Sequence, residues 1–396
     1  MNRTGESLPL LALAGDAHHA LAVWVEAVEG MPRVVGWYSH PLEPGRSLVA
    51  GLAESCRALG EILGRPVWDM VRDRPLLMDP AMPHRLGLEG AHTVVAALEP
   101  LAPPRVGLVG LTQGQSLAAA AQALVAAPCR LVGRWSAPLP EPQALAAAFR
   151  QARVDVVVLC GGYVDAAPRL APALMDLAET VVLALAQLPP GRRPHAIYAG
   201  HEGLAKAVRA LWGELLGGSS MATVANVLPA PGVPRGQELA VALSRHYWNA
   251  CLAMEVSRQV ARWQSPASIS LRSVSWGFAQ AVRLWRELHH LPGLHGLRTL
   301  GDPWLHVWVE ATAEGDRVRV AFTPAGEMAA LPGPWPPVGL VSGPWPEEIL
   351  GPPSSGQWWD AEGLLPALMA AGPVDARLGL ELLWTWLGLE AGDLRP

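Results

Sequence analysis

The sequence has 396 residues, of which 51% are hydrophobic and only 16% are charged, against about 25% charged residues in ordinary soluble domains. A chain of this length and apolar content can bury a large core, which excludes an intrinsically disordered protein. The 30 basic and 35 acidic side chains leave a formal net charge of −5. This balance provides no electrostatic footprint for nucleic acid or for an anionic membrane, so neither is expected as a partner.

The cysteines and the N-terminus indicate where the protein resides. Four cysteines, at positions 56, 129, 160 and 251, lie far apart and include no C-x-x-C pair, which fits neither a disulfide framework nor a zinc site. The apolar run at residues 8–14 follows Glu6 and ends at Gly15-Asp16. It is too short for a signal peptide, and no stretch of ~20 apolar residues spans a bilayer. We therefore expect a cytoplasmic protein.

Short apolar runs at residues 8–14, 20–26 and 33–38 are separated by glycine and proline, which predicts an opening β-meander. Strands and helices then alternate, which predicts βαβ units and a mostly parallel sheet. The expected strands are 105–110, 130–135, 154–160, 195–198 and 222–228, and the expected helices are 115–127, 142–153, 168–187 and 202–216.

The last part of the chain is predicted to be helical at first and then to form a second hairpin. Residues 235–290 favour helices with a break at 264–266, and the hairpin strands are expected at 306–310 and 317–322. A connection rich in proline, glycine and tryptophan follows at 331–357. Two apolar helices, at 362–371 and 375–387, are expected to end the chain.

The two hairpins resemble each other in sequence. Gly15-Asp16 precedes Val-Trp-Val-Glu-Ala at 23–27, and Gly301-Asp302 precedes the same five residues at 307–311. The spacing differs by two residues, and chance similarity is the alternative. Two such hairpins favour a duplicated fold that could hold a ligand between its halves.

Three glycine-containing turns are candidate ligand sites. Backbone amides at a glycine turn can bind phosphates, and a nearby carboxylate can hold Mg²⁺ through water, so Gly15-Asp16 and Gly301-Asp302 have suitable residue types. Gly-Asp is also ordinary turn chemistry. Gly161-Gly162 follows a predicted strand, at the carboxyl edge where parallel sheets bind ligands, with a structural tight turn as the alternative.

The chain carries no pattern for metal binding or covalent catalysis. Adjacent histidines such as His18-His19 point to opposite faces of a strand, and no H-E-x-x-H occurs. Asp16-Ala-His18 begins the cobalamin signature D-x-H-x-x-G, but Leu21 stands where its glycine is needed. No G-x-S-x-G occurs, and Cys160 lacks a sequence-local activating partner. We therefore expect no catalytic residue and no metal site.

Five segments carry a resemblance to a known family. They are VDVVVLCGGYVD at 154–165, IYAG at 197–200, ANVLP at 225–229, WDAEGLLPA at 359–367 and PVDA at 373–376. In content and order they resemble the MutL proteins encoded beside adenosylcobalamin-dependent glutamate mutase, which are unrelated to the mismatch-repair protein of that name. The likeness runs from the N-terminal hairpin to the last predicted helix.

This family is similar to the sugar kinases, heat-shock ATPases and actin. The resemblance implies an α/β fold of the duplicated actin-like ATPase type, with mixed sheets, flanking helices and a nucleotide cleft. It also implies a division into three parts. Residues 1–100 form an N-terminal actin-like subdomain with the first phosphate-type hairpin, 101–232 form the βαβ segment, and 233–396 form a helical segment, the second hairpin and a C-terminal actin-like part.

The chain departs from the family at the phosphate-binding turns, which read roughly Asp-x-Gly-Ser-Thr-Thr-Thr-Lys and Asp-x-Gly-Gly-Ala-Thr-Thr-Asp. Leu13 and Thr299 replace the leading aspartates, and Pro303 removes an amide donor. A Gly-Gly turn that would face adenosine becomes Gly343-Pro344. Metal-assisted phosphoryl transfer needs carboxylates on the metal and donors on the phosphates. We therefore expect a degenerate nucleotide cleft.

The resemblance and these losses together predict a pseudo-ATPase that acts as an accessory, chaperone-like or scaffold subunit. Its implied partner is an intact paralogue or a cobalamin-dependent mutase, and no cofactor is expected. Two alternatives stay open. One is a small-molecule sensor that uses Gly161 and Gly162. The other is an ATPase that binds ATP with magnesium through Gly15, Asp16, Gly301, Asp302 and Gly343.

Overall fold

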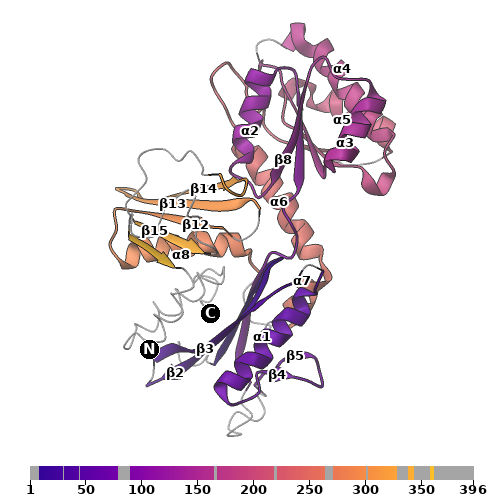
Figure 1. Cartoon of the computed structure of the whole chain (residues 1–396). Helices are drawn as coiled ribbons and strands as arrows, with labels where there is room; N and C mark the ends of the chain where they lie inside the picture. The colour runs from indigo at the N-terminus through magenta and orange to yellow at the C-terminus, as the bar shows by residue number, and fades with distance from the viewer. Residues whose placement is uncertain are drawn as a thin grey trace. The chain divides into compact units, whose positions relative to one another are not determined.

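The computed structural model describes residues 9–29, 31–43, 45–78, 90–164, 167–217, 221–263, 271–299, 302–327, 338–342 and 357–360. The chain divides into two compact units. Unit 1 comprises residues 1–102, 248–320 and 325–396, and unit 2 comprises residues 103–247 and 321–324. The fold is mixed α/β, with parallel and antiparallel sheets (Figure 1). The three-part division into 1–100, 101–232 and 233–396 stays a prediction.

The first sheet of unit 1 begins with the expected meander. It is formed by β1 (Leu10–Gly15), β2 (His19–Val28) and β3 (Met31–Pro41), with β6 (Thr93–Leu98) parallel to β1, in the order β3-β2-β1-β6. The central strand β1 is buried at all six positions, which explains its uninterrupted apolar sequence.

Two helices complete the core around this first sheet. Helix α1 (Leu48–Leu63) packs fully buried side chains such as Leu52 and Leu59 into it and ends at Gly64, whose φ of 67° suits glycine. Helix α7 (Glu255–Trp263) contributes Val260 and Trp263 to the same core cluster. A short hairpin, β4 (Trp68–Asp69) and β5 (Arg74–Pro75), follows α1.

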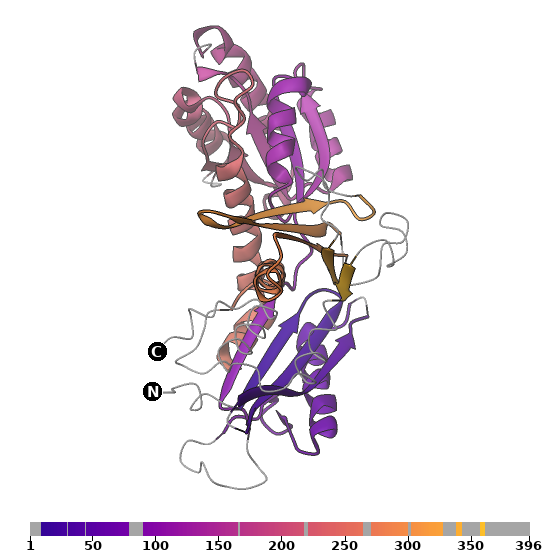
Figure 2. The same ribbon diagram turned by 90° about the vertical axis from the view of Figure 1, so that its left-hand side faces the viewer.

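The second sheet, which belongs to unit 1 except for residues 321–323 of β14, has the order β14-β13-β12-β15-β16. Its strands are β12 (Gly293–Arg298), β13 (Trp304–Thr312), β14 (Gly315–Thr323), β15 (Val338–Ser342) and β16 (Gln357–Asp360). Helix α8 (Val274–Leu288) runs along one face of the sheet (Figure 2). A Cβ at Gly296 would lie 2.2 Å from the side chain of Val282, so glycine allows this close approach of helix and strand.

The two sheets share one arrangement of their first strands. In each, the first strand lies between its antiparallel hairpin partner and a later parallel strand, β6 or β15. In the hairpin registers Leu13 pairs with Ala22, and Leu297 pairs with His306. Strand β1 therefore corresponds to β12, and β2 to β13, with the residue numbers shifted by 284. Asp16 and Asp302 differ by 286 positions. The two Gly-Asp dipeptides therefore do not occupy equivalent places in their hairpins.

Unit 2 contains the predicted parallel sheet, in the order β11-β10-β9-β7-β8. Its strands are β7 (Arg105–Gly110), β8 (Arg130–Ser136), β9 (Val156–Cys160), β10 (His195–Tyr198) and β11 (Met221–Thr223). Helices α2 (Ala118–Leu124) and α6 (Gln237–Ala253) contribute to one core cluster. The other cluster is built by α3 (Pro142–Ala152), α4 (Ala167–Ala186) and α5 (Ala205–Leu216) (Figure 1).

Two predicted elements of unit 2 have different bounds. The helix expected at 115–127 starts as a π-helical turn (Gln113–Leu117) and ends at Leu124, because the next residues form tighter turns in which Ala127 N–H binds Leu124 O. The strand expected at 222–228 ends at Thr223. Beyond it, the Asn226 side chain binds Gly162 O and Leu228 N–H, which bends the chain out of the sheet.

Other expectations were incomplete or fall outside the structure. Helix α1 and strands β6 and β12 were not predicted, and β15 lies within the segment expected to be a loop connection. The expected break at 264–266 and the two C-terminal helices lie outside the described residues. In the described part of the chain, no helix combines the length and the apolar character needed to cross a membrane.

Candidate functional site

Three charged residues meet at strand ends in unit 1. Asp16 follows β1, Glu99 follows β6, and Arg298 is the last residue of β12. The Arg298 guanidinium donates to Asp16 Oδ2 and lies 3.9 Å from Glu99 Oε2. All three residues are less than 9% exposed. We call Asp16, Glu99 and Arg298 the ion cluster.

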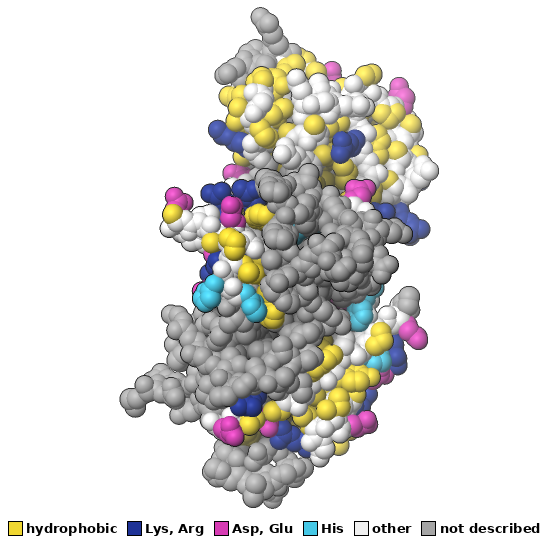
Figure 3. Space-filling model, turned by 60° about the vertical axis from the view of Figure 1, so that its left-hand side comes forward, with side chains coloured by type: hydrophobic (Ala, Val, Ile, Leu, Met, Phe, Trp, Pro, Cys, Tyr) yellow, Lys and Arg dark blue, Asp and Glu magenta, His cyan; other side chains and the backbone are white. Residues whose placement is uncertain are grey.

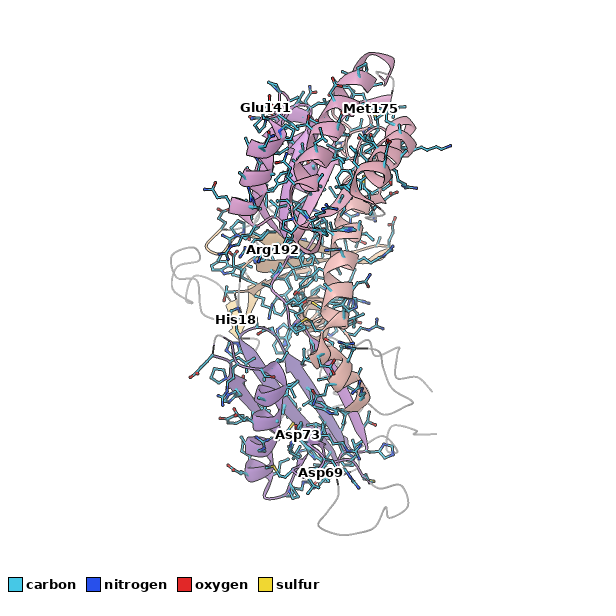
Figure 4. All side chains as sticks on the ribbon, turned by 90° about the vertical axis from the view of Figure 1, so that its right-hand side faces the viewer. His18, Asp69, Asp73, Glu141, Met175 and Arg192 are labelled. Atoms are coloured by element: carbon cyan, nitrogen blue, oxygen red, sulfur yellow. The ribbon has the colours of Figure 1, made fainter. Side chains whose placement is uncertain are left out.

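Both carboxylate oxygens of Asp16 are engaged. Oδ1 accepts the backbone N–H groups of His18 at 2.7 Å and His19 at 2.9 Å, which fixes the turn between β1 and β2. Oδ2 receives the hydrogen bond from Arg298. His18 marks this turn in Figure 4, at the opposite end of the first sheet from Asp69 and Asp73. Asp16 is therefore a turn residue and an ion-pair partner at once.

Glu99 connects the first sheet to helix α8. Its backbone N–H donates to Gly15 O at 2.8 Å, and its carboxylate accepts the N–H and the hydroxyl of Ser275, both at 3.0 Å. Burial raises the pKa of the Glu99 carboxyl, while Arg298 and the hydrogen bonds from Ser275 act in the opposite direction. The net effect is a raised pKa, and the charge of Arg298 limits how far burial raises it.

The ion cluster limits what can bind at these strand ends. Mg²⁺ prefers carboxylate oxygens, and two carboxylates are present, but a guanidinium already lies between them. A cation placed there would be repelled by Arg298, and a phosphate would meet the charges of Asp16 and Glu99. Among the described residues, no group of three or more His, Cys, Asp or Glu side chains is placed to hold a metal ion. One guanidinium compensates one of the two carboxylate charges, and the arrangement is that of a structural ion cluster.

The glycine and aspartate residues predicted from sequence have separate surroundings. A Cβ at Gly15 would lie 2.5 Å from Leu48 Cδ1, so this glycine lets α1 pack closely against β1. Asp302 is exposed and accepts the N–H of Ala325 at 3.2 Å. Gly301 and Gly343 lie outside the described residues.

Both hairpins are apolar at the strand position where the resemblance stated above would require a leading aspartate. Leu13 is fully buried in β1. The strand register assigns Leu297, also fully buried, as its counterpart in β12. Thr299, the counterpart of Leu13 in the turn motifs, stands two residues after Leu297. A carboxylate is therefore missing at both corresponding strand positions.

The candidates Gly161 and Gly162 lie in unit 2, directly after β9. Their φ angles are 137° and 84°, a region that favours glycine. The carbonyl of Gly161 accepts His201 N–H at 2.9 Å, and that of Gly162 accepts the Asn226 amide at 2.7 Å. Burial raises the pKa of the neighbouring Cys160 thiol to about 12, which disfavours the reactive thiolate form.

Sequence reasoning missed most of the ion cluster. Glu99, Ser275 and Arg298 belong to no motif, and Asp16 lies 282 residues from Arg298. One available signal is the position of Glu99 and Arg298 at the ends of apolar strands. Such polar residues often project from the carboxyl edge of a sheet. This signal can be used only once strands β6 and β12 are predicted, and neither was.

Comparisons with known proteins give only distant similarities. No protein-family model matches the chain, and no curated protein sequence matches it. Among solved structures, the chain is similar to nucleotide-free acetone carboxylase, at 10% identity and a TM-score of 0.34 over 80% of this chain. It spans about half of that chain, 48%. A second similarity is to YeaZ from Pseudomonas aeruginosa, at 12% identity and a TM-score of 0.23 over 98% of both chains. TM-scores this low do not establish a shared fold.

Proposed function

We propose that this protein is a degenerate MutL-like member of the duplicated actin-like ATPases, and that it acts as an accessory or scaffold subunit without ATP turnover. The ion cluster carries the proposal. It places an arginine of the chain itself between the two carboxylates at the strand ends, where a working enzyme of this type needs free metal ligands.

The shared strand arrangement of the two sheets supports the duplicated fold. Both sheets place the first strand between an antiparallel hairpin partner and a later parallel strand, and the Val-Trp-Val-Glu-Ala segments occupy the same register. A gene duplication accounts for both features together, whereas chance has to account for each separately.

The buried leucines support the loss of catalysis. Transfer of a phosphoryl group requires metal ions that neutralise the developing charge and side chains that hold them. Leu13 and Leu297 stand at the corresponding strand positions and are fully buried, so neither can contribute a metal ligand.

The proposed partner is another protein, either an intact paralogue or a cobalamin-dependent mutase, as the resemblance implies. The chain has 17 tryptophans, a residue type enriched at interfaces. Figure 3 shows hydrophobic side chains, with few charged ones between them, over the visible face of unit 2. Over unit 2 as a whole, the exposed hydrophobic residues include Val125, Val164, Leu183, Leu215, Val233 and Val241. Co-purification from the native cell tests this part, and a solitary monomer would contradict it.

The loss of nucleotide binding is tested by calorimetry with ATP and Mg²⁺. We expect the wild-type protein to show no binding tighter than the millimolar range. Asp302→Ala is the informative variant, because Asp302 is exposed and lies outside the ion cluster. Micromolar ATP binding by the wild type that disappears in Asp302→Ala would overturn the proposal in favour of an active nucleotide site.

A further inference from the structure

The strand order of unit 2 identifies a second place for a ligand. Of the strands in this sheet, β7 comes first along the chain. Its neighbours in the sheet are β8 on one side and β9 on the other. The loop after β7 leads to α2, which packs on one face of the sheet, and the loop after β9 leads to α4, which packs on the other. In parallel sheets, ligands bind outside the carboxyl ends of the strands at this reversal of order.

The carboxyl edge is well separated from the amino edge. Glu141 follows β8 and Arg192 precedes β10, and Figure 4 shows the two residues at opposite ends of the sheet. Residues 111–117 and 161–164 follow β7 and β9 at the carboxyl edge, directly at the reversal. We call these two segments the reversal loops.

Two hydrogen bonds and the close approach of the preceding strand ends hold the reversal loops together. The Cys160 thiol donates to Ser116 O at 3.6 Å, and Tyr163 Oη donates to Gln115 Oε1 at 2.5 Å. A Cβ at Gly110 would lie 3.1 Å from the carbonyl oxygen of Cys160, so glycine keeps the two strand ends close. The first loop forms a π-helical turn, a rare conformation that often occurs at functional sites.

The polar side chains of the reversal loops are uncharged. Thr112, Gln113 and Gln115 are exposed, and Tyr163 is half-buried. Residues 110–117 and 160–164 contain no Asp, Glu, Lys, Arg or His. Recognition of a phosphate or carboxylate by a cation is therefore not available from these segments. Amide side chains instead pair in a donor–acceptor fashion with the edges of planar heterocycles, and an aromatic ring can stack on them.

From this topology and chemistry we infer that the reversal loops bind an uncharged planar heterocycle of the nucleoside class. Gln115 and Tyr163 are the recognition residues, and their mutual hydrogen bond is exchanged for bonds to the ligand. The inference concerns unit 2 alone and does not depend on the function proposed above.

Calorimetry on the full chain tests the inference with adenosine, guanosine, cytidine and uridine, and with adenosine monophosphate as the charged counterpart of adenosine. We expect submillimolar binding of at least one nucleoside and no gain in affinity from the phosphate. Gln115→Ala should weaken binding about tenfold, because one paired amide contact is lost. Gln187→Ala, at an exposed position after α4 near the amino edge, should bind as the wild type does.

Three results would overturn the inference. They are no binding of any of the four nucleosides, equal binding by Gln115→Ala, and an affinity for the monophosphate about tenfold above that for adenosine. Tyr163→Phe keeps the ring and removes only the hydroxyl, so it separates hydrogen bonding from stacking. Circular dichroism of each variant confirms that it is folded. Asp302→Ala must leave nucleoside binding unchanged, which distinguishes this site from the nucleotide site tested above.

Discussion

At the scale of single residues, Arg298 decides the character of the candidate site. It is the one positive charge of the ion cluster, facing Asp16 and Glu99, and all three side chains are buried. Removal of one member of a buried ion pair leaves an uncompensated charge, which usually costs about 3–5 kcal/mol. Arg298 therefore stabilises unit 1 and at the same time takes the place a metal ion would need.

The substitution Arg298→Gln should destabilise the protein by about 3 kcal/mol and create a response to divalent cations. Without the guanidinium, Asp16 and Glu99 are two neighbouring carboxylates that Mg²⁺ can neutralise. We expect Mg²⁺ to restore part of the lost stability in urea denaturation of this variant, with no effect on the wild type.

The matched control for this experiment is Arg286→Gln. Arg286 forms a comparably buried ion pair with Asp316 at 2.7 Å, in the same unit. It should lose stability without any rescue by Mg²⁺. An equal response of both variants, or a loss below about 1 kcal/mol in Arg298→Gln, would contradict the role assigned to Arg298.

The sequence predicts that Asp16 is a candidate site residue and that it lies in a tight turn. It does not predict that Asp16 pairs with Arg298. Gly15-Asp16 has the composition of a tight turn, and Asp16 does accept the N–H groups of His18 and His19. The contact with Arg298 depends on how two separate sheets of unit 1 pack. No local pattern encodes such a contact, because ion pairs between distant segments follow from the fold alone.

At the scale of elements, strands β12 and β13 carry an unusual pair of buried histidines. His295 and His306 have no solvent exposure, and their ring centroids lie 5.9 Å apart. Burial, together with the neighbouring His306, lowers the pKa of His295 to about 2. Burial also lowers the pKa of His306 to about 4, against a smaller opposing effect of a hydrogen bond to the backbone of Glu327.

These histidines predict that the protein loses stability in acid. In the unfolded chain they take up protons below about pH 6.5, whereas in the folded protein they stay neutral until the pH approaches the lowered pKa values. The free energy of unfolding should fall by about 2 kcal/mol per histidine between pH 7 and pH 5. Denaturant titrations at several pH values measure this slope.

His295→Leu should remove the contribution of one histidine to the fall in the free energy of unfolding between pH 7 and pH 5. This expectation holds whatever the stability of the variant at pH 7. His92→Leu replaces an exposed histidine and should retain the wild-type slope. If the slope of His295→Leu equals that of the wild type, the buried pair is not the source of the acid sensitivity.

The elements of unit 2 were predictable because hydrophobic strands alternate with helices of ordinary length. Strand β9, with the sequence VVVLC, is buried throughout; the predicted strand 154–160 has the same end and starts two residues too early. Strand β12 has the sequence GLHGLR, and its glycines and histidine give no strand signal. It forms because Gly296 fits against α8 and because β13 and β15 pair with it.

At the scale of the whole molecule, the ion cluster belongs to one unit and the reversal loops to the other. Perturbing one should therefore leave the hydrogen bonds of the other intact. For Arg298→Gln we expect faster amide hydrogen exchange in β1, β6 and β12, where the cluster holds the strand ends, and unchanged exchange in β7 and β9. Exchange measured by mass spectrometry on peptides from each unit tests this. Equal acceleration in β7 and β9 would show that the two units unfold together.

The chain order of the ion cluster has a consequence for synthesis on the ribosome. Asp16 and Glu99 are translated long before Arg298, and nearly all of unit 2, as a continuous stretch, is made in between. Domains generally fold as they emerge. The nascent N-terminal sheet must therefore wait, with two acidic groups lacking their counter-charge, until residue 298 of 396, just over three quarters of this sequence, has been made. Unit 2 is the part whose strands are first all present for folding.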